Sequence, residues 1–208
     1  MAAKNVVNTM ISIFSICGIG ILLFISCGYG LCFSGNHFEI IGNFHHLFLS
    51  GVNLMKPFGT THIPLGVDII FQLMFALVTP ALFVGATFGR MKFSYLITFV
   101  CVWTLVVYYP LVHIIWSPAG LLAQYGLLDF AGGTVVHINA GITALVLSIL
   151  LGKRSRPSKD DDHYNLPWIL LGTTFLWIGW YGFNAGSALG INNVALQAFM
   201  TTTIATAS

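Results

Sequence analysis

The sequence predicts an all-α polytopic membrane protein, with about five full transmembrane helices and the start of a sixth. Of the 208 residues, 57% are hydrophobic and only 7% are charged, whereas a soluble domain contains about 25% charged residues. The mean hydropathy is +0.88. The 22 glycines agree with this prediction, because small residues allow membrane helices to approach one another closely.

The first predicted transmembrane helix covers residues 10–33. This apolar run is long enough to cross a bilayer and too long to be the core of a signal peptide. The connecting loop, residues 34–64, contains an apolar patch. The spacing of these residues suits a short interfacial helix, and a structured loop fits it equally well. The residues of the patch are Phe44, Leu47, Phe48, Val52 and Met55.

Two further apolar runs, residues 65–88 and 93–116, predict the second and third helices. Pro80 is expected to kink the second helix, because proline removes a backbone hydrogen bond. The third helix is expected to kink or end near Pro110. Trp116 then lies at the depth of the membrane interface, where tryptophan is common.

The fourth predicted helix covers residues 130–151 and the fifth covers residues 167–189, with a hydrophilic loop, 153–165, between them. Asn192 or Asn193 could cap a sixth helix. That helix reaches the end of the sequence after roughly 15 residues, fewer than the ~20 that a spanning helix needs.

Lysine and arginine residues predict the orientation. They cluster at the Met1 end, in the turn containing Arg90 and Lys92, and in the loop 153–165, at alternate ends of successive helices. The positive-inside rule therefore places these three regions in the cytoplasm, with the protein in a plasma or inner cell membrane. The loop that joins Trp116 to the fourth helix faces outward.

The fourth helix contains the main candidate for a site, His137. If the helix begins near Asp129, the imidazole lies about two turns, roughly 12 Å, inside it. Gly133 and Gly141 lie four residues away on either side, on the same face, and leave space beside the ring. An ionisable residue within a span suggests a functional site; the alternative is a hydrogen-bonded packing residue. Asp129 is expected to act as an N-cap.

Several aromatic and small residues are weak signals individually. Phe71 and Phe75 lie four residues apart in the second helix, and Phe183 and Ser187 lie four apart in the fifth. Packing explains each pair, and an interfacial anchor explains Trp116. A cluster of aromatic faces with a hydroxyl would suit an ammonium-type or organic cation. The fifth helix also has a stripe of small residues for close helix contact: Gly179, Gly182, Gly186 and Gly190.

Other functional classes lack their motifs. The sequence contains no P-loop, no GxGxxG, no GxSxG and no basic patch that would indicate nucleic acid. The four cysteines have no CxxC spacing, so we predict buried thiols, and we predict no catalytic residue, metal ligand or cofactor. The spans contain no ladder of carboxylates like those that line pores for bare cations. An uncharged small solute that passes one titratable ring fits better.

Two long motifs resemble signatures of a known family. Residues 129–141 (DFAGGTVVHINAG) are similar to the signature of the Amt/Mep/Rh ammonium transporter family, on its Amt side. Residues 180–188 (WYGFNAGSA) resemble a second motif of that family. Shorter matches at residues 4–9 (KNVVNT) and 71–76 (FQLMFA) extend the resemblance over nearly the whole chain.

The resemblance implies a fold of eleven helices in two inverted halves, with three protomers per assembly and a pore in each. Residues 1–208 would form part of this ammonium transporter domain, and the loop 153–165 would join the pseudo-repeats. Compared with the family, the chain lacks the first helix and the C-terminal helices that supply a second pore histidine, so we expect a fragment. A PII-type regulator is a further implied partner of the full-length protein.

The resemblance also implies roles for individual residues. Trp116, Phe75 and Ser187 match the outer site that recruits ammonium. Phe75 and Phe183 match a gate of two stacked rings, and His137 matches the first of two hydrogen-bonded pore histidines.

The implied function is transport of ammonium, with methylammonium as an analogue. The ion binds outside, ammonia passes His137, and the proton follows separately. Asp129 matches an aspartate that supports recruitment and the pore without necessarily contacting the substrate. Two alternatives are an ammonium sensor that transports little and an Rh-type gas channel. An enzyme is the least favoured class, because the motif around His137 supplies no nucleophile or metal partner.

Overall fold

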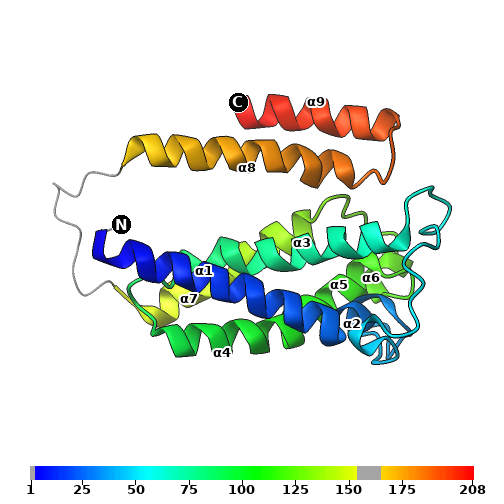
Figure 1. Ribbon diagram of the computed structural model, residues 1–208, viewed down its shortest axis with the longest axis horizontal. Coiled ribbons are helices and arrows are strands. Elements are labelled where there is room, and N and C mark those ends of the chain that lie inside the picture. Colours follow the sequence, from blue (N-terminus) through cyan, green and yellow to red (C-terminus); the bar gives the residue numbers. More distant parts are fainter. Residues whose placement is uncertain (1–2, 154–164) are drawn as a thin grey trace.

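The computed structural model describes residues 3–153 and 165–208, which form helices joined by loops, with no β-strand within these ranges (Figure 1). Five continuous helical runs are long and apolar enough to cross a membrane. They are Val6–Phe33, Leu65–Val84, Phe93–Gln124, Gly133–Leu151 and Leu166–Gly186. The predicted all-α polytopic architecture is confirmed, and the chain is an integral membrane protein.

The first run consists of α1 (Ala3–Leu23), the π-helical segment η1 (Phe24–Gly28) and α2 (Tyr29–Phe33). It ends at Phe33 as predicted, where Ser34 turns into an extended conformation. It begins at Ala3, before the predicted start at residue 10, because helical hydrogen bonding continues into the polar residues that precede the apolar run.

The loop after α2 forms no long interfacial helix. Its only helical turn within residues 34–64 is the 3-10 segment η2 (Leu47–Leu49), so the structured-loop alternative is the correct one. The second run, α3 (Leu65–Val84), continues through Pro80 and ends four residues earlier than predicted.

The third run does not end at Pro110. It consists of α4 (Phe93–Trp103), the π-helical η3 (Thr104–Tyr108) and α5 (Tyr109–Trp116), followed by the short α6 (Leu121–Gln124). The wider turn of η3 lies just before the proline. A π-helical turn displaces the carbonyl that a proline would otherwise clash with, so the helix passes the proline intact.

The fourth run starts later than predicted. It consists of η4 (Gly133–Ile138) and α7 (Asn139–Leu151), so its first helical residue is Gly133 instead of residue 130. The fifth run is α8 (Leu166–Gly186), and α9 (Asn193–Ala207) follows it. Asn192 caps α9 as predicted, because its side-chain oxygen accepts a hydrogen bond of 2.9 Å from the Ala195 amide.

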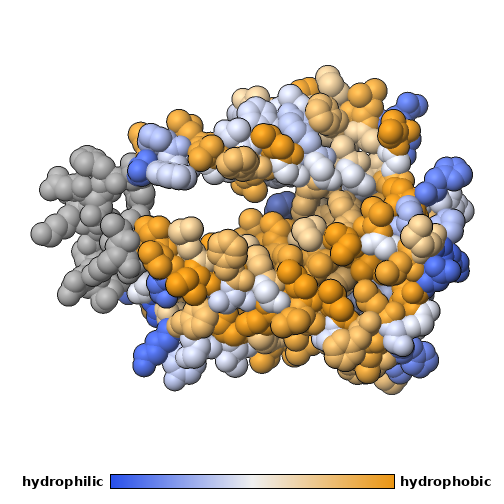
Figure 2. Space-filling view, in the orientation of Figure 1, coloured by the Kyte–Doolittle hydropathy of each residue, from blue (hydrophilic) through white to orange (hydrophobic). Residues whose placement is uncertain are grey.

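The helices form two layers. α3 contacts both α1 and α7 in the lower bundle, whereas α8 contacts mainly α9, and Figure 1 shows this pair as a separate upper layer. The hydrophobic core lies inside the lower bundle, and α8 contributes no buried residue to it. Figure 2 shows open space between the layers.

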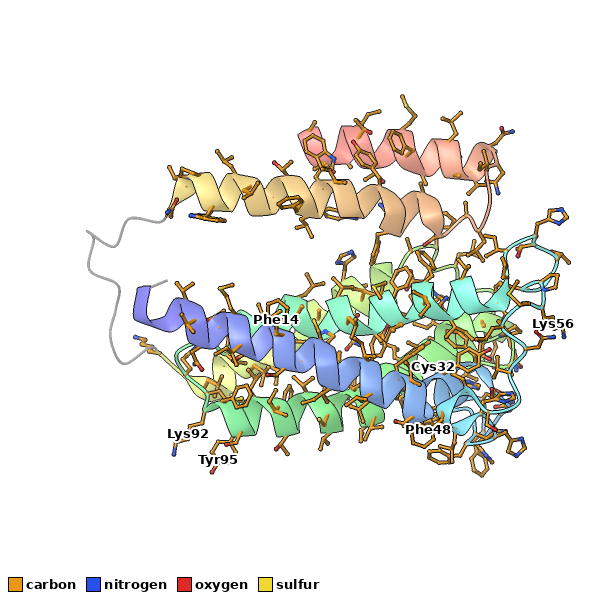
Figure 3. All side chains as sticks on the ribbon, viewed as in Figure 1. Phe14, Cys32, Phe48, Lys56, Lys92 and Tyr95 are labelled. Atoms are coloured by element: carbon orange, nitrogen blue, oxygen red, sulfur yellow. The ribbon has the colours of Figure 1, made fainter. Side chains whose placement is uncertain are left out.

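Arg90, Lys92 and Lys153 lie at one end of the bundle, and Lys56 lies at the other. The Arg90 guanidinium donates to the carbonyl of Gly152 at 2.7 Å, which places the turn after α3 beside the end of α7 and Lys153. Figure 3 shows Lys92 at this end and Lys56 at the opposite end. The other residues of the predicted basic loop, 154–164, lie outside the described ranges, so the predicted junction of pseudo-repeats at 153–165 stays a prediction.

Candidate functional site

Four of the predicted site residues lie in one row of ring contacts. The Phe75 ring, on α3, packs against the Trp116 ring at 5.1 Å between centroids, with the planes at 68°. On its other side Phe75 contacts Phe183, from α8, at 4.5 Å. Phe183 in turn lies 5.9 Å from the imidazole of His137. The row thus joins residues from four spans, and its two central rings, Phe75 and Phe183, are more than a hundred positions apart in the sequence.

Phe75 is the central ring of this row. It is 2% exposed, and it also receives the edge of Phe71, one turn earlier on α3, at 4.8 Å. Packing was the explanation that the sequence suggested for Phe71. The Phe71 ring packs against Gly186 on α8. A Cβ at Gly186 would lie 3.3 Å from the Phe71 ring, so the glycine lets α8 approach α3 closely.

Trp116 is held by a hydrogen bond from its indole nitrogen to the backbone carbonyl of Asp129, at 2.8 Å. Its helix is anchored one turn earlier by the fully buried His113, whose Nδ1 lies 2.9 Å from the carbonyl oxygen of Cys32 on α2. These two bonds fix the indole between α3 and the loop before α7. The face of the ring is therefore oriented before any ligand arrives.

The Asp129 carboxylate accepts four backbone hydrogen bonds. One oxygen accepts from the amides of Gly132 and Gly133, and the other accepts from Thr134 and Val135, at 2.7–2.9 Å. Asp129 thus caps the helix as predicted, but it lies four residues before the first helical residue, Gly133, instead of at the N-cap position. Gly132 adopts φ +88°, a left-handed conformation that suits glycine, and this turn folds the loop so that the carboxylate reaches the helix start.

His137 lies one turn inside its helix and not two, because that helix begins at Gly133. The side chain is exposed within this chain. It faces an open cavity of about 640 Å³ whose lining includes Asp129, Thr134, Asn184 and Thr201. A Cβ at Gly141 would meet no atom within 4 Å, so the space expected beside the imidazole is present.

Ser187 lies at the end of α8, next to the glycine that packs on Phe71. Its hydroxyl donates to the carbonyl of Phe183, one turn earlier, at 2.9 Å. The hydroxyl oxygen keeps a lone pair for another donor. Ser187 thus shares the turn of α8 that carries Phe183.

Trp180 is the residue that sequence reasoning missed. Its ring lies 6.0 Å from that of His137 and lines the same cavity. It precedes Phe183 by three residues, and a spacing of three places two side chains on one helix face. This spacing was the feature of the sequence from which Trp180 could have been predicted as a site residue. In the described part of the chain, no group of three His, Cys, Asp or Glu side chains could hold a metal ion.

Comparison with known proteins identifies a family. The model of the Ammonium Transporter Family matches residues 1–208. The ammonium transporter of Aquifex aeolicus is 44% identical over 207 residues, covering 99% of this chain and 48% of that protein. That of Bacillus subtilis is 39% identical over 206 residues, covering 99% of this chain and 50% of that protein. The chain spans about half the length of these curated relatives.

Solved structures agree with this result. A protein described as "Sensor Amt Protein" matches with a TM-score of 0.87 and 29% identity, over 100% of this chain and 53% of that one. Mep2 from Saccharomyces cerevisiae matches with a TM-score of 0.73 and 32% identity, over 86% of this chain and 40% of that one. The chain therefore belongs to the ammonium transporter family.

Proposed function

We propose that this chain supplies the recruitment site, the gate and the first pore histidine of an ammonium transporter. Ammonium would bind beside Trp116, pass the rings of Phe75 and Phe183 as ammonia, and continue along His137. The observation that carries this proposal is the unbroken row of ring contacts from Trp116 to His137, at 5.1, 4.5 and 5.9 Å.

Recruitment depends on attraction between a cation and an aromatic face. Such a contact contributes about 0.5–2 kcal/mol, more when the site is desolvated. Trp116 has its nitrogen occupied by the Asp129 carbonyl, so its face, not its N–H group, is the part left for a ligand. The Ser187 oxygen would add a hydrogen-bond acceptor for an ammonium N–H group.

The gate separates the two forms of the substrate. Phe75 and Phe183 are in contact, and a charged ion that passes between them loses its water without gaining an ion partner. Moving a charge into such an apolar region is far more costly than moving a neutral amine. Ammonia would therefore cross more easily than ammonium, and the proton would take a separate route.

The imidazole of His137 lies next to the gate ring of Phe183, at 5.9 Å between ring centroids. A neutral imidazole both donates and accepts one hydrogen bond, so it is suited to guide ammonia and to relay a proton. The exposed position of His137 on a cavity of about 640 Å³ leaves it accessible to a partner group. We propose that a second pore histidine, from the part of the relatives' length that this chain does not span, lies opposite.

We further propose that the end carrying Arg90 and Lys153 faces the cytoplasm of a cell with this protein in its plasma or inner membrane. The argument is the positive-inside rule, because these residues share one end of the bundle. A homotrimeric assembly and a PII-type regulator are proposals that rest on the family resemblance.

Methylammonium uptake tests the proposed function. We would express this chain, and a chimera in which it replaces the matching segment of the Aquifex aeolicus ammonium transporter, in cells without ammonium transporters of their own. Uptake by the chimera above that of empty cells, competed by ammonium, is the expected result, and no uptake is expected from residues 1–208 alone. If the chimera reaches the membrane but takes up no methylammonium, while the unmodified Aquifex protein does, the transport proposal fails.

A sensor is the second candidate, and one observation favours it. The solved structure described as "Sensor Amt Protein" has a TM-score of 0.87 over 100% of this chain. A sensor would bind ammonium at the Trp116 site and show little uptake. Ammonium binding measured by calorimetry, in the absence of uptake in the same chimera, would favour the sensor over the transporter.

A further inference from the structure

The loop after α2 does not extend away from the helices. Its residues 42–49, here called the return segment, run back along the helix that they follow. The Gly42 amide donates to the carbonyl of Leu31 at 2.7 Å. Further along, the His46 ring lies 6.3 Å from that of Tyr29. The turn η2 then contacts η1, which lies deeper in the same membrane-spanning run.

Two glycines, Gly30 in α2 and Gly42 in the return segment, make this close approach feasible. A Cβ at Gly30 would lie 2.6 Å from the Asn43 carbonyl oxygen, and one at Gly42 would lie 2.3 Å from the Gly30 oxygen. Neither distance is compatible with a side chain. The return segment is therefore packed directly on the helix backbone.

The depth of the return segment follows from helix geometry. η1 lies five to nine residues before the end of the span at Phe33, which is about 8–14 Å along the helix axis. The run Val6–Phe33 has 28 residues, about 42 Å, and so exceeds a hydrocarbon layer of about 30 Å by about 6 Å at each end. The turn η2, beside η1, therefore lies at or below the boundary of the acyl chains. Figure 3 places Phe48 at about the level of Cys32, a residue of the span.

The outward face of the return segment carries large apolar side chains and one exposed polar residue, His45. Phe48 is 74% exposed and Phe44 is 60% exposed, whereas Leu49 points into the core. Phe48 and Leu49 both adopt positive φ, 53° and 57°, an unfavourable conformation that turns one side chain out and the next one in. Residues 40–55 contain no charged side chain. Aromatic side chains in an uncharged segment at this depth suit the boundary between lipid headgroups and acyl chains.

We propose that the return segment is embedded in the bilayer leaflet at that end of the bundle, with Phe44 and Phe48 in contact with lipid acyl chains. The partner is thus the lipid itself, and the loop is a re-entrant membrane contact instead of a water-exposed connection. In Figure 2 this end of the molecule carries both apolar and hydrophilic patches, so Phe44 and Phe48 are the side chains of the return segment assigned to the lipid.

Photolabelling from lipid tests this proposal without any substitution. The chain would be reconstituted in vesicles of phosphatidylcholine that carries a diazirine on an acyl chain close to the headgroup, illuminated, digested and analysed by mass spectrometry. Three segments of the same chain serve as references. Phe14, 75% exposed at mid-span on α1, reports contact with lipid; Met55, 79% exposed near Lys56, reports the aqueous end; Tyr108 and Tyr109 report the buried core.

We expect adducts on residues 44–48 at a yield similar to that on the Phe14 segment, and several-fold above the yield on the Met55 segment. Labelling of residues 44–48 at the level of Met55 would mean that water covers the segment, and the proposal would be wrong. Labelling at the level of Tyr108 and Tyr109 would mean that protein, such as a second copy of the chain, covers it, which would equally overturn the proposal.

Discussion

The indole nitrogen of Trp116, at the end of α5, donates a hydrogen bond of 2.8 Å to the backbone carbonyl of Asp129, in the loop between α6 and η4. The carboxylate of the same aspartate holds the start of the helix that carries His137. One residue therefore positions both ends of the proposed path, through its main chain and through its side chain. The two functions are separable by mutation, because a side-chain substitution leaves the carbonyl in place.

Asp129→Ala tests the side-chain function. The alanine leaves four amides at the start of η4 without their carboxylate. Hydrogen bonds to a charged group contribute about 1.5–3 kcal/mol each and are not additive, so we expect a loss of roughly 3–5 kcal/mol in the free energy of unfolding. Unfolding in mixed detergent micelles measures it. The matched control is Asn192→Ala, which removes one cap bond from the Ala195 amide and a longer bond of 3.3 Å to the Ala188 carbonyl, and is expected to cost about 0.5–2 kcal/mol. Equal losses for the two variants would contradict the assigned role.

Phe75→Ala tests the central ring. The side chain is 2% exposed and contacts three other aromatic rings. A buried phenylalanine truncated to alanine typically loses about 3–5 kcal/mol of folding free energy. The control is Phe14→Ala, because Phe14 is 75% exposed on α1 and has no comparable packing to lose. The same unfolding assay should separate them, and a Phe75→Ala variant as stable as Phe14→Ala would show that the ring row is not a packed unit.

Much of the fold could be predicted because apolar runs report directly on membrane spans. The end of the first span near Phe33 and a cap at Asn192 or Asn193 could be predicted, since each marks a local change in composition or a local hydrogen bond, and the structure has them at Phe33 and Asn192. The start of the fourth helix could not be predicted in this way. Asp129 acts as a cap from four residues before Gly133, through a left-handed turn at Gly132, and this geometry is not a simple N-cap pattern.

The environment of His137 is a long-range property. The sequence places the imidazole within a span, but which helices cover its face is not encoded locally, and here that face borders a cavity beneath α8 and α9. The contact between Phe75 and Phe183 is equally long-range, and it was expected only through the family resemblance. The spacing of three puts Trp180 and Phe183 on one helix face, a signal that the sequence analysis did not use, and it does not show what that face contacts.

Orientation in the membrane can be tested by thiol labelling. Cysteines at Lys92 and Met55, introduced separately into a background without the four native cysteines, lie at opposite ends of the bundle, and both positions are exposed. A membrane-impermeant maleimide added to intact cells should label the Met55→Cys variant and should label the Lys92→Cys variant only after permeabilisation. Labelling of Lys92→Cys in intact cells, with Met55→Cys protected, would reverse the proposed orientation.

Trp116→Leu tests recruitment. Leucine keeps an apolar side chain against Phe75 but removes the aromatic face that would attract a cation. Loss of about 0.5–2 kcal/mol of cation–π attraction corresponds to a rise of about 2- to 30-fold in the methylammonium concentration for half-maximal uptake. Maximal uptake at saturating substrate should change less. The control in the same chimera is Trp168→Leu, at an exposed tryptophan in the first turn of α8. An unchanged concentration dependence in Trp116→Leu would leave this residue as an interfacial anchor only.

His137→Ala tests the proposed pore. The measurement must distinguish the movement of charge from the uptake of substrate. Alanine removes the group that donates and accepts hydrogen bonds beyond the gate, while Trp116, Phe75 and Phe183 keep their contacts with one another. We therefore expect ammonium binding at the outer site to persist and the ammonium-induced current to fall, measured beside methylammonium uptake in the same membranes. His62→Ala, at an exposed loop position, is the matched control and should change neither.

A carboxylate at position 137 adds a potential negative charge, whereas alanine only removes the imidazole. His137→Glu places a potential anion beyond the gate, and an anion lowers the cost of holding a desolvated cation. We expect this variant to let a cation reside or cross more readily, so that the selectivity for ammonium over potassium falls. The two variants therefore predict different effects from one position: loss of current with alanine and loss of selectivity with glutamate. If His137→Ala retains both its ammonium-induced current and its selectivity over potassium, the imidazole is a packing residue and the proposed path does not pass it.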